Sequence, residues 1–344
     1  MKSLTAVIEK LMKNHSLQPE EMTESMNAIM DGEVHEIQLA AFLTALRHKG
    51  ETVEELVAAA KVMRSRAKAL PYSCPDAVDT CGTGGDGGKT FNVSTAAALV
   101  AAAGGAKVLK HGNRSVSSKS GSADVLEAMG ISIHQEPAEA MGKLHRYGMA
   151  FLFAPDYHAS MKHAAGVRKM LGFRSVFNML GPLVNPGSVE QQVMGVYDAS
   201  LTRPMAEALM KLGVKRAMVV HGSDGMDELT VTGDSYVCEV KHGEILEYVI
   251  KPEELGLELV DLKELEGDGP EENAEKIRLV LEGKRDGSRS IVLLNAGAVL
   301  YVAGIARNLQ EGVLKAAEII DDGSALAFYE LVRTDNKKDG EMAC

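Results

Sequence analysis

The sequence predicts an α/β protein in which a small all-helical N-terminal domain precedes a large domain with a mostly parallel central sheet. Two patterns support this prediction. Residues 1–70 carry apolar positions at helical spacing, whereas short apolar runs alternate with helical segments from Ala77 onward. The composition agrees, because the chain lacks tryptophan and only 4% of its residues are aromatic. Such a composition favours helices packed on a sheet over an aromatic-cored sandwich.

Four short helices are expected at the N-terminus. They occupy residues 4–11, 22–30, 34–48 and 53–67. Thr52 and Glu55 form a capping box ahead of the fourth helix. Because the helices and their loops are short, we expect a small bundle over residues 1–72, completed by helices near 160–185.

The remaining residues, 73–344, are expected to form one α/β domain. Strands are predicted at 77–81, 107–110, 131–134, 150–154, 193–198 and 217–222. Helices are predicted at 94–105, 122–130, 137–148, 159–171 and 202–213, and again from about residue 271. This alternation is typical of a parallel sheet with helices on its faces. Residues 229–250 alternate apolar and polar side chains, which predicts antiparallel strands and a hairpin at one edge.

Charge and cysteine usage limit the possible functions. The formal net charge of −11 argues against a nonspecific nucleic-acid binder. The four scattered cysteines show no zinc-binding spacing, so we expect reduced thiols in a cytoplasmic protein. The N-terminus carries charges within its apolar pattern and does not resemble a signal peptide. No apolar run approaches 18 residues, so no membrane span is expected.

A glycine-rich stretch, DTCGTGGDGGKTFNVST at 79–95, lies between a predicted strand and a predicted helix. Free backbone N–H groups and the positive end of the helix would bind an anion there. The spacing matches neither the dinucleotide fingerprint nor the P-loop of nucleotide-binding proteins. A flexible linker is the alternative, but the apolar flanks favour phosphate binding.

A second stretch, KHGNRSVSSKSGS at 110–122, occupies the same position after the next strand. It combines Lys110, His111, Arg114 and Lys119 with several serines. Cationic side chains neutralise phosphate, and hydroxyl groups complete its hydrogen bonds. An ordinary solvated loop is the alternative for this stretch taken alone. Two neighbouring anion loops suggest a ligand with two separated phosphate groups.

Two further elements add candidate residues. Asp227 and Glu228 are adjacent carboxylates in a glycine-rich loop after a predicted strand. They would repel a polyphosphate unless a cation lay between, and Mg²⁺ meets this need. Arg168 lies on a predicted helix that precedes the rigid segment 181–186, although a surface salt bridge is the ordinary alternative for a lone arginine.

These motifs together resemble those of the anthranilate phosphoribosyltransferases. The resemblance rests on DTCGTGGD, FNVSTA, KHGNRSVSSKSGSADVLEAMG, FLFAPDYHASMKHAAGVRKMLGFRSVFNMLGPLVNP and DGMDELT, and it covers essentially the whole chain. It implies a fold of the nucleoside phosphorylase/phosphoribosyltransferase type. The implied reaction joins anthranilate to phosphoribosyl pyrophosphate, giving N-(5-phosphoribosyl)anthranilate and pyrophosphate in tryptophan biosynthesis. It also implies a homodimer joined through the helical domain.

The resemblance assigns roles residue by residue. Phosphoribosyl pyrophosphate would contact Gly82, Gly85, Asp86, Thr90, Asn92, Val93, Ser94, Thr95, Lys110, His111, Gly112, Asn113, Arg114, Ser115, Val116, Ser117, Ser118 and Ser122. Anthranilate would contact Gly82, Asn113, Arg168 and His158, and Mg²⁺ would bind Ser94, Asp227 and Glu228. No residue is assigned as catalytic, although His111 could accept a proton late in the reaction.

Two alternatives remain at this point. A pyrimidine nucleoside phosphorylase would share the fold but would bind inorganic phosphate and a nucleoside, without magnesium. A non-catalytic relative could bind nucleic acid through the same fold. The Asp227-Glu228 pair speaks against both, and the acidic net charge speaks against the second.

Overall fold

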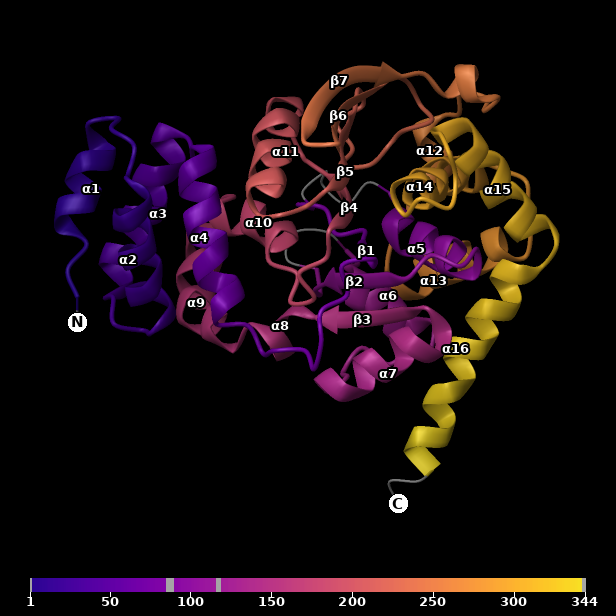
Figure 1. Ribbon diagram of the computed structural model, residues 1–344, viewed down its shortest axis with the longest axis horizontal. Helices are drawn as coiled ribbons and strands as arrows, with labels where there is room; N and C mark the ends of the chain where they lie inside the picture. The colour runs from indigo at the N-terminus through magenta and orange to yellow at the C-terminus, as the bar shows by residue number, and fades with distance from the viewer. Residues whose placement is uncertain (1, 85–89, 116–118, 342–344) are drawn as a thin grey trace.

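The computed structural model describes residues 2–84, 90–115 and 119–341. Figure 1 shows a helical bundle at one end of the molecule and the sheet with its helices at the other. The four predicted N-terminal helices are confirmed as α1 (Thr5–Met12), α2 (Pro19–Met30), α3 (Glu36–Lys49) and α4 (Val53–Ser65). The capping box is also confirmed, because the Thr52 side chain accepts the Glu55 N–H and the Glu55 side chain accepts the Thr52 N–H.

Two helices from the middle of the chain pack against this bundle. Helix α9 (Lys162–Leu171) contacts α2 and α3, and α10 (Val176–Leu180) contacts α3 and α4. Their apolar side chains, Ala164, Val167 and Phe177 among them, share one core cluster with the first four helices. The segment after β3 therefore links the bundle to the sheet.

Within the described residues the sheet has seven strands, in the order β3-β2-β1-β4-β5-β6-β7. The strands are β1 (Val78–Asp79), β2 (Val108–Gly112), β3 (Met149–Phe153), β4 (Gln191–Gly195), β5 (Arg216–Gly222), β6 (Ser235–Lys241) and β7 (Glu244–Ile250). Strands β1 to β5 pair in parallel, and β6 and β7 form the predicted antiparallel hairpin at the edge. The mostly parallel sheet is thus confirmed.

Two predicted strands are wrong. Ile131 and Ile133 are buried at alternate positions, as in a strand, but this segment follows α6 as an irregular chain without a sheet partner. The segment 229–233 is also irregular, because the hydroxyl groups of Thr230 and Thr232 donate to the Asp224 carboxylate. The alternating burial at 131–134 was read correctly, but burial does not by itself provide a neighbouring strand. At 229–231 three consecutive residues are buried, so the expected alternation is absent.

Helices cover both faces of the sheet. On one face α5 packs against β2 and α14, and α14 contacts β4 and β5. On the other face α7 lies against β3, and α11 lies against β5 and β6 and also contacts α4 of the bundle. These and the remaining helices are α5 (Val93–Ala103), α6 (Ser122–Ala128), α7 (Pro137–Tyr147), α8 (Ala154–Tyr157), α11 (Thr202–Lys211), α12 (Leu262–Leu265), α13 (Pro270–Leu281), α14 (Gly287–Val302), α15 (Leu309–Asp321) and α16 (Ser324–Glu341). The 3₁₀ turns are η1 (Ala159–Met161), η2 (Gly181–Leu183), η3 (Ala199–Leu201) and η4 (Pro252–Leu255).

No helix within the described ranges is both long and apolar enough to cross a membrane.

A buried ion pair stabilises the bundle. The Glu55 side chain is fully buried and that of Lys49 is 5% exposed, and Lys49 Nζ lies 2.8 Å from Glu55 Oε2. Glu55 also accepts the backbone N–H groups of Leu17 and Thr52, at 2.8 Å each. One carboxylate therefore holds the α1–α2 connection, the start of α4 and a buried lysine together.

Replacing Glu55 with alanine should lower the free energy of unfolding by about 3–5 kcal/mol, because Lys49 would remain buried without its counter-charge. Urea denaturation followed by circular dichroism measures this change. Glu54→Ala is the control, since Glu54 is an exposed neighbour paired with Lys211 and its loss should matter little. Equal destabilisation by the two variants would contradict the role given to Glu55.

Candidate active site

A cavity of about 300 Å³ lies at the carboxyl ends of β1, β2, β4 and β5. Ligands of open parallel sheets bind at such an edge. The predicted site residues that line it are Gly82, Thr90, Asn92, Val93, Ser94, Lys110, His111, Gly112, Asn113, Arg114, Ser115, Ser122, Arg168, Asp227 and Glu228. Both predicted anion loops and the acidic loop therefore face one cavity.

Some predicted residues lie elsewhere. Thr95 is fully buried within α5 and does not line the cavity. His158 is 4% exposed and also lies away from the cavity wall. Gly85, Asp86, Val116, Ser117 and Ser118 lie outside the described residues.

The side chains of two consecutive β2 residues, Lys110 and His111, point to opposite sides of the sheet. Lys110 points toward α5, where its Nζ donates to the Thr80 hydroxyl at 2.8 Å and to the Ser94 hydroxyl at 3.3 Å. Burial lowers the pKa of Lys110, and the nearby Cys81 thiol and Asp79 carboxylate act in the opposite direction. His111 points to the other side, toward η2. The alternation of a strand thus places a cation and an imidazole at two different walls of the cavity.

Asp79 of β1 bonds to the backbone of β2 at His111. Its Oδ1 accepts the His111 N–H at 3.0 Å. The side chain is fully buried, and burial raises its pKa to about 6, against the opposing effects of Asn185 and Lys110.

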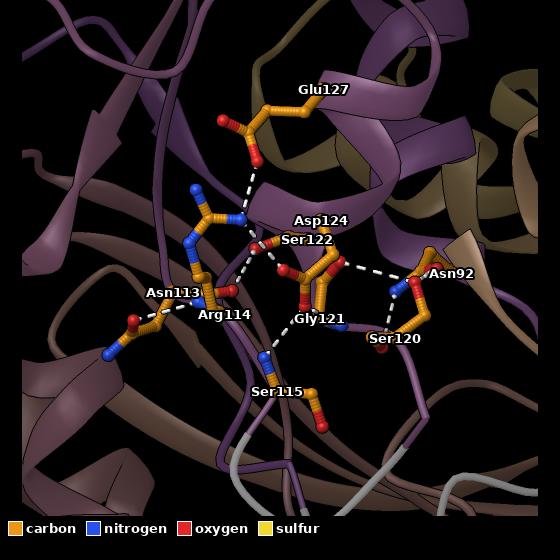
Figure 2. Close-up of polar contacts among 9 residues, drawn as sticks. All are labelled: Asn92, Asn113, Arg114, Ser115, Ser120, Gly121, Ser122, Asp124 and Glu127. Atoms are coloured by element: carbon orange, nitrogen blue, oxygen red, sulfur yellow. Dashed lines mark hydrogen bonds and ion pairs between the residues drawn. The ribbon is translucent and has the colours of Figure 1, made fainter. Parts of the chain in front are cut away.

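Asp124 binds the described residues at both ends of the second anion loop, as Figure 2 shows. The Asp124 carboxylate accepts the N–H groups of Ser115 and Gly121, at 2.9 Å each, and the Arg114 guanidinium at 3.0 Å. Burial disfavours ionisation of this carboxyl, but the donated N–H groups and Arg114 outweigh it and lower the pKa. A side chain at position 121 would meet Ser115 N at 2.4 Å, so glycine is required where the loop closes.

The same loop is tied to the glycine-rich loop by amide side chains. Asn92 donates to the Ser120 carbonyl at 3.1 Å and accepts the Ser120 hydroxyl at 3.0 Å, a pair that Figure 2 also shows. Asn273 of α13 donates to the same Asn92 oxygen at 2.9 Å. Asn92 therefore links the two loops in addition to lining the cavity.

The acidic loop reaches the start of α5. Glu228 Oε1 accepts the Ser94 N–H at 3.1 Å, which suits the positive end of that helix. A side chain at Gly195 would lie 1.4 Å from the Asp227 carbonyl oxygen, so only glycine at the end of β4 lets this loop approach. Asp227, Glu228 and the Ser94 hydroxyl consequently share one side of the cavity.

This donor set fits a magnesium ion. Among the described residues there is no cluster of three His, Cys, Asp or Glu side chains that would hold a metal unaided. Magnesium, however, characteristically uses one or two carboxylates and completes its shell with water and substrate phosphates. Two adjacent carboxylates and a serine hydroxyl at the edge of an anion-binding cavity match this requirement.

The opposite end of the cavity is less charged. Arg168 lies over the ring of Phe177, with 5.2 Å between the guanidinium carbon and the ring centroid. Burial lowers its pKa, and within the described part of the chain no carboxylate pairs with it. The surface salt bridge that the sequence left open is therefore not found there, and a positive charge faces the cavity.

Two histidines lie at this end with ring centroids 5.2 Å apart: His111 lines the cavity, and His158 lies behind it. His111 Nδ1 lies 3.2 Å from the Gly181 carbonyl, which can only accept, so Nδ1 carries the proton. Burial, together with His158, lowers the His111 pKa to about 3, so the ring is neutral and its Nε2 is an acceptor. His158 Nε2 donates to the Val184 carbonyl at 3.0 Å, and burial lowers its pKa to about 4.

Sequence reasoning missed several residues of the cavity wall. Among them are Phe177, Asn178, Gly181, Pro182 and Asn273. The Gly-Pro dipeptide signalled a rigid turn but not its ligand-facing position. Asn273 follows no motif and reaches the cavity only because α13 packs against α6.

Comparison with known proteins gives a consistent result. Residues 74–326 match the model of the glycosyl transferase family, a/b domain, and residues 5–67 match the helical bundle domain of that family. An anthranilate phosphoribosyltransferase of Brevibacillus brevis is 52% identical over 96% of this chain and 97% of its own length. One from Alkaliphilus metalliredigens is 51% identical, over 93% of this chain and 94% of its own.

Solved structures agree with these sequence relatives. The anthranilate phosphoribosyltransferase of Thermus thermophilus superposes with a TM-score of 0.90 at 43% identity, covering 96% of this chain and 99% of that one. The enzyme from Saccharomyces cerevisiae in complex with PRPP and Mg gives 0.88 at 29% identity, covering 97% and 98%. The fold, the cavity and these relatives together establish that the chain belongs to the anthranilate phosphoribosyltransferase family.

Proposed function

We propose that this chain transfers the phosphoribosyl group of phosphoribosyl pyrophosphate to the amine of anthranilate, releasing pyrophosphate. The observation that carries the proposal is the convergence of two anion loops, a carboxylate pair and Arg168 on one cavity. The yeast relative has been solved with PRPP and Mg and also with 4-fluoroanthranilate. Both the cavity chemistry and these relatives support the same pair of substrates.

The two anion loops match the two phosphate-bearing ends of phosphoribosyl pyrophosphate. Phosphoribosyl pyrophosphate carries a 5′-phosphate at one end and a pyrophosphate at the other. Lys110, Arg114 and the hydroxyl groups of Ser94 and Ser122 offer donors for both ends. Bound Mg²⁺, held by Ser94, Asp227 and Glu228, would neutralise charge on the departing pyrophosphate.

Arg168 would fix the acceptor. Its guanidinium can grip the anthranilate carboxylate with paired hydrogen bonds, which aims the neighbouring amine. The amine lone pair then attacks C1′ as the bond to pyrophosphate breaks, through a ribosyl oxocarbenium-like transition state. Orientation of this kind can contribute about 7–11 kcal/mol, so positioning alone accounts for much of the catalysis.

The new C–N bond leaves an acidic proton on nitrogen. His111 Nε2 is buried, is an acceptor and has no hydrogen-bond partner within the described residues. A pKa of about 3 makes His111 a weak base, so it would accept this proton only after the bond has formed. His158, whose Nε2 is committed to Val184, would support the site from behind rather than touch anthranilate.

The rate of anthranilate consumption tests the proposal directly. Loss of anthranilate fluorescence should require both phosphoribosyl pyrophosphate and Mg²⁺. The 52% identical relative favours the transferase over the two alternatives given above. Phosphate-dependent release of base from thymidine or uridine would instead support the phosphorylase.

We also propose a homodimer joined through the helical bundle. Met12 on α1 is 70% exposed and Ile37 on α3 is 74% exposed, and α1 packs against α3. Exposed apolar side chains in the bundle suit an interface between two copies. A monomeric mass in light scattering would contradict this assignment.

Asp124→Asn should raise the KM for phosphoribosyl pyrophosphate about tenfold, the effect of weakening a charged hydrogen-bond acceptor that folds the phosphate loop. Glu127→Gln is the matched control. Glu127 also pairs with Arg114 but accepts no loop N–H among the described contacts, so its variant should stay close to wild type. Steady-state kinetics with each substrate varied in turn measures both, and equal effects would argue against Asp124 as the organiser of the loop.

Replacing both Asp227 and Glu228 with alanine should lower kcat about 10²–10³-fold, the factor expected when metal-assisted charge stabilisation is lost. The dependence on Mg²⁺ should also disappear, while the circular dichroism spectrum stays unchanged. Near-normal turnover at ordinary Mg²⁺ concentrations would remove the reason for assigning these carboxylates.

Arg168→Ala should raise the KM for anthranilate about 10–100-fold, because a charge-assisted pair to the carboxylate is lost. The KM for phosphoribosyl pyrophosphate should change little. Lys169→Ala is the control, since Lys169 follows on the same helix but is exposed and does not line the cavity. A parallel rise in both KM values would show that Arg168 does not act on the acceptor.

A further inference from the structure

The segment Gly181–Val184 forms the wall behind the acceptor end of the cavity, and its backbone is held in an unusual way. Four consecutive carbonyl groups each accept a hydrogen bond from a side chain of a different element. The pairs are His111 Nδ1 to Gly181 at 3.2 Å, Gln192 Nε2 to Pro182 at 2.8 Å, Arg64 Nε to Leu183 at 2.7 Å and His158 Nε2 to Val184 at 3.0 Å. Every peptide plane of the wall is thus fixed from outside it.

This support has a local cause. The wall contains Pro182, which has no N–H, and only one 3₁₀ turn, so its backbone makes few hydrogen bonds of its own. Buried carbonyls without partners are costly. Side chains from β2, β4, α4 and the turn after α8 supply those partners, and in doing so they set where Gly181 and Pro182 face the cavity.

Arg64 differs from the other three donors because it comes from the N-terminal bundle. It lies in the last turn of α4, and its Nη1 also donates to the Leu212 carbonyl at the end of α11, at 3.2 Å. One guanidinium therefore joins the bundle, the cavity wall and a helix on the sheet. Burial lowers its pKa, with Asp79 opposing, and within the described residues it forms no ion pair with a carboxylate. Its donors are used on backbone carbonyls.

We propose that Arg64 is a positioning residue for the acceptor substrate: by holding the Leu183 carbonyl, it sets the Gly181–Pro182 wall against which the anthranilate ring lies. This inference rests on the proposed function, since it presumes that the acceptor occupies the Arg168 end of the cavity. Arg64 itself does not line the cavity, so its effect on the acceptor passes through the wall. The loops that face phosphoribosyl pyrophosphate are not among its hydrogen-bond partners.

Arg64→Met tests the proposal, with Arg66→Met as the matched control. Arg66 follows α4 immediately, and its guanidinium bonds Asn27 and Asp31 entirely within the bundle. Arg64→Met should raise the KM for anthranilate about tenfold, the factor of one lost hydrogen bond from a charged donor. The KM for phosphoribosyl pyrophosphate should stay near wild type, and Arg66→Met should change neither. Arg64→Lys, which keeps one donor, should restore part of the loss.

Several results would overturn the proposal. These are an unchanged KM for anthranilate in folded Arg64→Met, an equal rise in both KM values, or the same rise in Arg66→Met. If Arg64→Met does not fold, Gln192→Met decides, because it frees the Pro182 carbonyl of the same wall. An unchanged KM for anthranilate in that variant would also reject the proposal. Failure of the wild-type chain to consume anthranilate would instead reject the proposed function itself.

Discussion

The parallel pairing of β1 with both β2 and β4 is the constraint on which the site depends. Val78 pairs with Val108 on one side and with Gln191 on the other, and β5 continues in the same direction. All four carboxyl ends therefore open at one edge, where the glycine-rich loop, the second anion loop (110–122) and the acidic loop of Asp227 and Glu228 meet. Reversing any of these strands would separate the groups that share the cavity.

At this edge a cation and a carboxylate lie in the same cavity, and each is held by other polar groups. Lys110 is held by Thr80 and Ser94, while Glu228 is held by the Ser94 N–H, so the cation and the carboxylate are fixed by neighbouring polar groups. Asp124 binds both described ends of the second anion loop, and Asn92 ties that loop to the glycine-rich loop. Donors and acceptors set in advance in this way lower the cost of reorganisation when a charged substrate binds. At the opposite end of the cavity, a neutral His111 and Arg168, which lies over the Phe177 ring, form a wall suited to an aromatic acid.

Much of this arrangement could be predicted from the sequence. The bundle, the parallel sheet and the edge hairpin followed from hydrophobic periodicity and from the Thr52–Glu55 capping box, which are local signals. The loop residues followed from composition, because glycine, serine and basic residues are concentrated directly after two predicted strands. The family resemblance added Arg168, which no local pattern singles out as a ligand residue.

Features that depend on tertiary packing could not be predicted. Ile131 and Ile133 are buried at alternate positions like strand residues, but their segment does not pair with β3, the edge strand on that side of the sheet. The need for glycine at position 195 arises from the approach of Asp227, more than thirty residues later. Asn273 and Arg64 reach the site region from helices that are far apart in the sequence.

His158 was expected beside anthranilate, but its Nε2 donates to the Val184 carbonyl. Sequence spacing alone does not indicate this hydrogen bond. The division of the chain near residue 73 stays a prediction.

A crystal structure of the chain with phosphoribosyl pyrophosphate and Mg²⁺ bound tests the central claim most directly. The account predicts that the two phosphate-bearing ends of the sugar contact the glycine-rich loop and the loop closed by Asp124, with the metal at Ser94, Asp227 and Glu228. A sugar bound at another surface, or one whose phosphates leave either loop without contact, would contradict it.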